Sequence, residues 1–221
     1  MDLLKILRSF EEFIFEATTW LVLYPLTLWR IMRDPWGAMA YSDAQQNAPE
    51  DSRYNDAISP PLLLLATIVL LNLIGLALHM AQPVGQGELG RRVLGSQQHL
   101  ILLRSLLFSL IPLLSAVTLL RRQKIAISRD ALRAPFYAQC YLAAPFAATV
   151  SIGGIMLQRP SASNAVAGFL ALAGVAWFVV VQIRWFQTKL DVSRRAAFGL
   201  TAGSMAMALL FLLVIVLPLV M

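Results

Sequence analysis

The chain has 221 residues, of which 58% are apolar and 14% charged, and its mean hydropathy of +0.69 excludes a water-soluble globular protein. Its net charge of +6 is spread over short loops and span ends rather than gathered on one helix face, which argues against binding to nucleic acid. Cys140 is the only cysteine, so neither an internal disulfide nor a cysteine metal cluster can form.

Residues 1–22 have the hydrophobic periodicity of an amphipathic helix. Lys5, Arg8, Glu12 and Glu16 fall on one side of a helical wheel, and no signal-peptide cleavage site follows. We expect this helix to lie flat in the membrane interface; the alternative is a helix packed against the cytoplasmic ends of the spans. Its apolar side consists of Leu3, Ile6, Leu7, Phe10, Phe13, Ile14, Ala17 and Leu21.

The segment from Ala17 to Met32 is apolar on all sides and contains Pro25. It is shorter than a membrane-spanning helix, and Trp20 and Trp29 suit the boundary between lipid and water. We therefore expect residues 1–40 to form an interfacial N-terminal segment that is kinked at Pro25. A re-entrant half-helix is the alternative.

Residues 41–60 form a polar break in the sequence. Four acidic residues and few side chains that could be buried predict a mobile cytoplasmic linker. Ser59 followed by Pro60 predicts a helix start, with Ser59 as the N-cap and a proline in the first turn, where its missing N–H costs nothing.

Residues 61–221 contain five apolar stretches, each long enough to cross the roughly 30 Å hydrocarbon layer at roughly 1.5 Å per residue. The sequence therefore predicts an all-α polytopic membrane protein with a bundle of five transmembrane helices. Gly85, Gly87 and Gly90 follow the first span in G-x-G-x-x-G spacing, but no strand precedes them, so we expect an external turn rather than a nucleotide site. The predicted spans are 62–81, 100–120, 135–157, 165–186 and 196–221.

The loop from Arg121 to Arg133 sets the predicted orientation, because it carries five basic residues against the single Asp130. Loops rich in Lys and Arg stay on the cytoplasmic side during insertion. In the five-span arrangement, fourteen Lys and Arg residues lie on the side of this loop and three on the other side. The sequence thus predicts a cytoplasmic N-terminus and a C-terminus across the membrane.

No Asp or Glu lies within the five predicted spans, which argues against a proton relay at the centre of the membrane. We expect the arginine inside the second span to extend to the outer interface; alternatively it binds an anionic headgroup or substrate together with Arg91 and Arg92. The spans also contain three amide side chains, which we expect to form hydrogen bonds between helices, although they could line a polar path. These candidate substrate-binding residues are Asn72, Arg104, Gln139 and Gln182.

Small residues at four-residue spacing predict close helix packing. Gly199 and Gly203 form a G-x-x-x-G motif in the fifth span, and Ala143 and Ala147 form a similar stripe in the third. We therefore expect spans three to five to pack closely and the leucine-rich spans one and two to face lipid.

The sequence offers no set of residues for catalysis. No Ser/His/Asp set, paired catalytic carboxylates, phosphate-binding loop or metal-spaced cluster can be assembled. We predict no catalytic residue, no cofactor and no metal, and a protein that is not an enzyme.

Two segments, LYPLTLWRIMRDPW at Leu23–Trp36 and RYNDAISPPL at Arg53–Leu62, resemble parts of bacterial proteins of the Yip1 superfamily that are often labelled permeases. The order of a cytoplasmic N-terminal region and five C-terminal spans is similar as well. The resemblance implies an integral protein of the bacterial inner membrane with a periplasmic C-terminus.

Two functional hypotheses follow. The first is a non-enzymatic membrane protein that organises lipids or partners, either another membrane protein or further copies of itself. The alternative is a permease, transporter or channel of unknown substrate. Missing carboxylates in the spans favour the first, whereas Pro112 and Pro145, which can interrupt helices around a site, favour the second.

Overall fold

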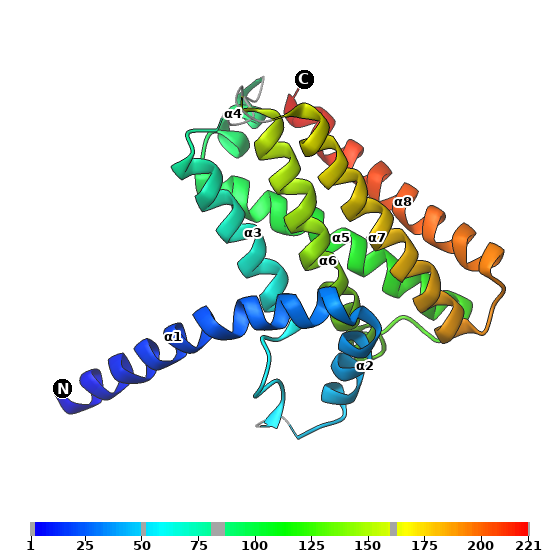
Figure 1. Cartoon of the computed structure of the whole chain (residues 1–221), viewed down its shortest axis with the longest axis horizontal. Helices are drawn as coiled ribbons and strands as arrows, with labels where there is room; N and C mark the ends of the chain where they lie inside the picture. The colour runs from blue at the N-terminus through cyan, green and yellow to red at the C-terminus, as the bar shows by residue number, and fades with distance from the viewer. Residues whose placement is uncertain (1–2, 50–51, 81–86, 160–162, 221) are drawn as a thin grey trace.

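A computed structural model describes residues 3–49, 52–80, 87–159 and 163–220, and these residues form helices and connecting loops without a strand (Figure 1). The all-α fold predicted from the sequence is therefore confirmed. In chain order the helices are α1 (Leu3–Arg33), α2 (Pro35–Gln46), α3 (Pro60–Ala77), α4 (Gly87–Leu94), α5 (Gln97–Arg122), α6 (Arg129–Leu157), α7 (Asn164–Leu190) and α8 (Arg194–Val220).

Five of these helices, α3 and α5 to α8, are long and apolar enough to cross a membrane, as predicted. Their ends differ from the predicted ones by a few residues because local capping decides where they begin. α6 starts six residues earlier than expected, since the Ser128 side chain caps it by accepting a hydrogen bond from the Ala131 N–H at 3.1 Å. Ser59 is the N-cap of α3 and Pro60 follows it, but the serine side chain makes no capping bond.

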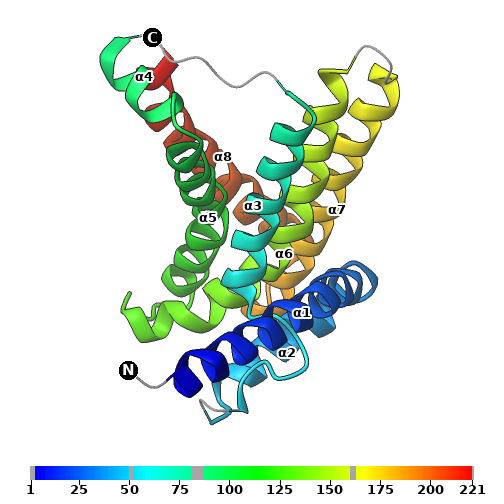
Figure 2. The same cartoon turned by 90° about the vertical axis from the view of Figure 1, so that its left-hand side faces the viewer.

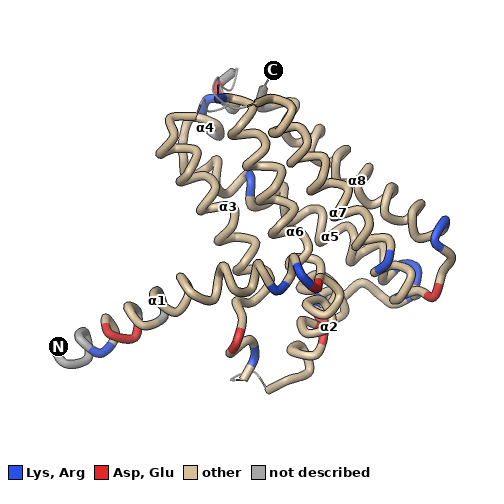
Figure 3. Tube along the Cα trace, viewed as in Figure 1, with Lys and Arg blue, Asp and Glu red and all other residues tan. Residues whose placement is uncertain are grey.

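The five long helices run side by side, and α6 occupies the centre, where it packs against α3, α5 and α7 (Figures 1 and 2). We call the end of the bundle that carries α1, α2 and the loop after α5 the basic end. Figure 3 shows most of the charged residues near the two ends of the bundle, and Arg104 is the basic residue that interrupts the uncharged stretch of α5. Figure 2 shows α5 and α8 separating from α3, α6 and α7 towards the end that carries α4.

α1 is one continuous helix of 31 residues with Pro25 inside it, so the predicted amphipathic helix and the segment after it are not separate elements. It crosses the basic end of the bundle without entering it, which differs from the re-entrant alternative (Figures 1 and 2). Asp34 ends α1 because Pro35 disfavours helical backbone in the residue before it, and the Asp34 side chain then caps α2 through the Gly37 N–H at 2.9 Å.

Residues 41–60, predicted to be a mobile linker, are partly helical and partly buried in the structure. Residues 41–46 belong to α2, and Ser42, Ala57 and Ile58 are buried. The charged composition of this stretch conceals Tyr54, whose ring lies against Tyr137 and Tyr141 of α6, and Tyr41, whose ring lies against Tyr54. Of the three glycines expected in an external turn, Gly87 and Gly90 lie in α4, while Gly85 falls outside the described residues.

Glycines allow α6 and α7 to pack closely. A Cβ atom on Gly174 would lie 2.1 Å from the side-chain Oγ1 of Thr149, and one on Gly153 would lie 3.1 Å from the Ala167 carbonyl oxygen, so neither position has room for a larger residue without a shift of its neighbour. Ala143 and Ala147 are fully buried in α6.

The glycines of α8 do not pack within the chain. No atom lies within 4 Å of a Cβ built on Gly199 or Gly203, and both residues are exposed. In the apolar stretch of α8 17% of residues are buried, against 44% in α3, so the first span is more enclosed than the fifth, contrary to expectation. The reason is that α3, despite its leucines, lies directly against α6.

The α6–α7 contact predicts opposite effects for one substitution at two glycines of α7. Gly174→Ala should lower stability, because its methyl group overlaps Thr149 and overpacking costs about 1–3 kcal/mol. Gly168→Ala should raise stability by up to about 1 kcal/mol, since the new methyl group meets open space and alanine favours helix. The unfolding temperatures of the two variants in detergent measure this difference in stability. An equal rise of the unfolding temperature in both variants would contradict the close approach of α6 and α7.

Candidate functional site

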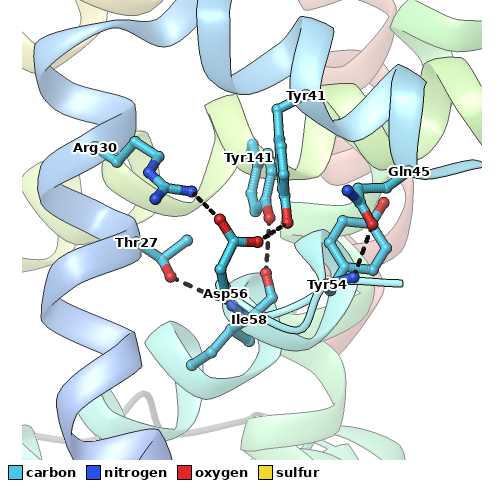
Figure 4. Close-up of polar contacts among 8 residues, drawn as sticks. All are labelled: Thr27, Arg30, Tyr41, Gln45, Tyr54, Asp56, Ile58 and Tyr141. Carbon is cyan, nitrogen blue, oxygen red and sulfur yellow. Dashed lines mark hydrogen bonds and ion pairs between the residues drawn. The ribbon is translucent and has the colours of Figure 1, made fainter. Parts of the chain in front are cut away.

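Four tyrosines join three parts of the chain at the basic end. The ring of Tyr54, in the segment before α3, lies 6.1 Å from that of Tyr41 on α2, 6.4 Å from Tyr137 and 6.5 Å from Tyr141, both on α6. Tyr137 and Tyr141 are four residues apart and so share one helix face. We call these four residues the tyrosine cluster; Figure 4 shows three of them.

Polar contacts with α2 fix the position of Tyr54. Its backbone N–H donates to Gln45 Oε1 at 2.9 Å, and Gln46 Nε2 donates to its hydroxyl at 2.7 Å. Its φ of 58° lies in the left-handed region, which costs a side-chain-bearing residue roughly 1–2 kcal/mol. The contacts of ring, hydroxyl and backbone offset that cost, so the conformation depends on docking to α2 and α6.

Asp56 connects α1 to α2. Its carboxylate accepts hydrogen bonds from the Tyr41 hydroxyl and from Arg30 Nη1, the latter at 3.1 Å (Figure 4). The Tyr41 hydrogen bond, together with Arg30, lowers the pKa of Asp56 below its ordinary 3.8. Burial and the neighbouring carboxylate raise the pKa of Tyr41 far above its usual range, so a neutral phenol donates to an ionised carboxylate.

The backbone of Ile58 is held from two sides. Its N–H donates to Thr27 Oγ1 on α1 at 3.3 Å, and its carbonyl accepts from the Tyr141 hydroxyl on α6 at 2.8 Å (Figure 4). Nearby, the Tyr24 hydroxyl of α1 donates to Thr67 Oγ1 of α3 at 3.0 Å. These contacts attach the second half of α1 to two membrane-crossing helices.

α2 is also attached to α7. Lys189 Nζ lies 2.6 Å from Asp43 Oδ2, and the Arg184 guanidinium stacks 4.1 Å from the centre of the Trp36 ring. A cation over a tryptophan face is attracted by the ring quadrupole. Taken together, the contacts at the basic end hold α1 and α2 in position against α3, α6 and α7.

Of the four intramembrane candidates, the structure brings two together. The Arg104 guanidinium on α5 donates to Asn72 Oδ1 on α3, while Asn72 Nδ2 donates to the Ile68 carbonyl of its own helix at 2.9 Å. Arg104 thus contacts a neighbouring helix instead of extending alone to the interface.

The other two candidates lie nearer the basic end. Gln182 Nε2 on α7 donates to Ser115 Oγ on α5 at 2.8 Å, with both residues buried, as expected for an amide that links helices. Gln139 is fully buried, and neither atom of its amide has a partner among the described residues. The described residues contain no group of three His, Cys, Asp or Glu side chains placed to hold a metal.

The contacts at the basic end were not predicted from the sequence. Tyr54 and Asp56 lie in a stretch whose composition is that of a linker, and their partners are distant in the chain. One signal was available: Tyr137 and Tyr141 at four-residue spacing near the start of a predicted span form an aromatic face that needs a partner.

The Asp56 contacts predict a pH-dependent stability difference. Asp56→Asn should lower stability by about 1 kcal/mol at pH 7, since it removes the charge that Tyr41 and Arg30 stabilise. Because folding depresses the pKa of Asp56, its contribution is present above pH 3.8 and is lost as pH falls through the lower folded-state value.

Urea unfolding of wild type and Asp56→Asn from pH 7 to pH 3 tests this, with Glu12→Gln on the exposed part of α1 as the matched loss of a carboxylate. The gap between wild type and Asp56→Asn should close towards pH 3. A gap that is constant over this range, or one of equal size for Glu12→Gln, would show that Asp56 is not coupled to folding.

Comparison of the chain with protein-family models, with curated proteins and with solved structures gave no match. The resemblance to Yip1-like proteins therefore stays a prediction.

Proposed function

We propose that this chain is a non-enzymatic integral membrane protein that organises lipid at its basic end through α1. The observation that carries the proposal is the first half of α1, residues 8–22, which we call the α1 arm. It extends beyond the bundle at the level where the spans end (Figure 1). Trp20 and Leu21, near the end of the arm, border a groove formed with α3, and the part of the arm before them would meet the membrane interface.

The α1 arm presents apolar side chains without protein cover. Phe10 is 61% exposed, Phe15 71% and Leu21 76%. Arg8 and Glu12 lie on its polar side and are exposed as well. Inserting a large apolar side chain into lipid is worth roughly 1.5–3 kcal/mol, so a few of them hold such a helix in the interface.

The predicted apolar face is described only in part. Phe10, Ile14 and Leu21 are exposed, as that face requires for contact with lipid. The side chains of Leu3, Ile6, Leu7, Phe13 and Ala17 lie outside the described part of the chain.

The second half of α1 supports the proposal by fixing the direction of the arm. Leu23, Tyr24, Leu28 and Ile31 pack against the core formed by α3 and α6, so this half of the helix cannot rotate freely. The exposed Trp29 is a typical interfacial anchor. The docked half would thus keep the arm level with the membrane surface.

The two segments that resemble Yip1-like proteins contact each other at this place. Arg30, in the first segment, pairs with Asp56 in the second, and Thr27 accepts from the Ile58 N–H. This contact supports the proposal that the resemblance concerns how α1 docks on the bundle. We propose on the same basis a protein of the bacterial inner membrane.

Transport, the alternative function, receives less support. A path through the bundle would continue from Arg104 to polar groups nearer the basic end. There, however, Gln182 and Ser115 are buried and hydrogen-bonded to each other, which favours a structural use.

The placement of the arm predicts different environments for two positions on α1. In a Cys140→Ala background, a fluorophore on Phe10→Cys should be quenched by brominated lipid in vesicles of the full-length protein. A fluorophore on Glu12→Cys should be quenched mainly by aqueous iodide, because it lies on the polar side. Equal quenching of both positions by iodide would place the arm in water and contradict the lipid role.

The proposed orientation is tested by reporter fusions. Alkaline phosphatase should be active when fused after Met221 and inactive when inserted at Lys124. The reason is that, when Arg104 is left out of the count, fourteen of the seventeen Lys and Arg residues lie on the same side of the membrane as Lys124. Activity at Lys124 with none at Met221 would reverse the arrangement.

A further inference from the structure

We infer that Arg104 is the anion-binding residue of a lipid site at the α4 end of the bundle, and that the ligand is an anionic phospholipid. Arg104 lies at the junction of a polar cavity and an apolar groove. This site is at the opposite end of the bundle from the α1 arm, so either proposal can fail without the other.

The charge of Arg104 has no acidic partner within the spans. The sequence has no Asp or Glu in any of the five predicted spans, and on the side of the membrane that Arg104 approaches Glu88 is the only acid. Glu88 is paired with Arg92 in α4. Arg104 is the eighth residue of α5 and is half-buried, and a charge in that position is stabilised by an opposite charge, which an anionic ligand would supply.

The geometry leaves donors for such a ligand. The guanidinium has five N–H groups, and the contact with Asn72 uses Nη1. Asn72 is 5% exposed, and its Nδ2 is bound to the Ile68 carbonyl, so its Oδ1 is turned towards Arg104 and orients the guanidinium. A planar fork of N–H groups suits phosphate oxygens, which it can bind in pairs.

The polar cavity has a volume of about 290 Å³ and lies between α3, α5 and α6. Ser151 and Gln158 of α6 line it together with Asn72 and Arg104. This volume is at the lower edge of the roughly 300–1,000 Å³ typical of small-molecule sites. Most of its lining residues are apolar, and the hydroxyl, amide and guanidinium groups of the four polar ones suit a phosphate headgroup.

The apolar groove has a volume of about 430 Å³ and lies between α5, α6 and α8. Arg104 and Phe108 line both the groove and the polar cavity, so one molecule can place a charged head in the first and a hydrocarbon chain in the second. The groove also borders Leu209 of α8, which is 56% exposed and faces the space that lipid fills around a membrane-crossing helix. Entry from the bilayer therefore identifies the ligand as a membrane lipid.

The test is a titration of full-length protein in mild detergent with phosphatidylglycerol, with bound lipid counted by native mass spectrometry. Arg104→Gln should weaken binding about tenfold or more, because glutamine keeps a hydrogen bond to Asn72 and loses the charge. Arg104→Lys, which keeps the charge without the fork, should weaken it less. Arg122→Gln, at the basic end of the same helix, is the control and should bind as wild type does.

A second pair of variants tests the groove and does not touch the charge. Ala206→Phe fills the groove from α8 and should weaken phosphatidylglycerol binding, whereas Ala202→Phe, one turn earlier on the same helix and outside the groove lining, should not. Both alanines are exposed, so neither change overpacks the core. This pair decides the matter if Arg104→Gln does not fold.

Three results would overturn the inference. The first is equal binding of phosphatidylcholine with identical chains, which would show that no anion site exists. The second is displacement of the lipid by glycerol 3-phosphate, which would make a soluble phosphate the ligand. The third is unchanged binding in both Arg104→Gln and Ala206→Phe, which would remove Arg104 and the groove from the site.

Discussion

The structure depends on the narrowness of α6. Helices in lipid gain little from the hydrophobic effect when they associate, so close packing and hydrogen bonds must hold them together. Ala138, Ala143, Ala144 and Ala147 are all fully buried, and these small side chains let α3, α5 and α7 approach α6 together. A larger residue in the middle of α6 would move at least one of these helices outward.

At the basic end, contacts among tyrosine rings and hydrogen bonds hold the helices together. The third and fourth turns of α6 carry Tyr137 and Tyr141, which hold Tyr54 and, through it, α2. The backbone of Ile58 then links α6 to α1. One central helix therefore controls both the packing of the bundle and the direction of α1, which connects the core to the proposed lipid function.

How far the sequence predicted the structure depended on the range of the interactions. The five spans were predictable because length and hydropathy are local properties, and Ala143 and Ala147 lie in the core at the place their spacing suggested. Gly199 and Gly203 have the same spacing but lie on an exposed face, because a small-residue motif does not specify its partner. Asn72 and Arg104 were recognised singly, and only the crossing of α3 and α5 reveals them as a pair.

The central claim is that the docked half of α1 holds the arm in a fixed direction across the basic end. The most direct test is the distance between two spin labels, at Glu12 on the arm and at Arg195 at the start of α8, in Cys140→Ala protein in lipid nanodiscs. The account predicts one narrow distance distribution that broadens when Tyr54→Ala loosens the segment before α3. A broad distribution in the protein with Tyr54 intact would show that α1 moves freely, and would contradict the account.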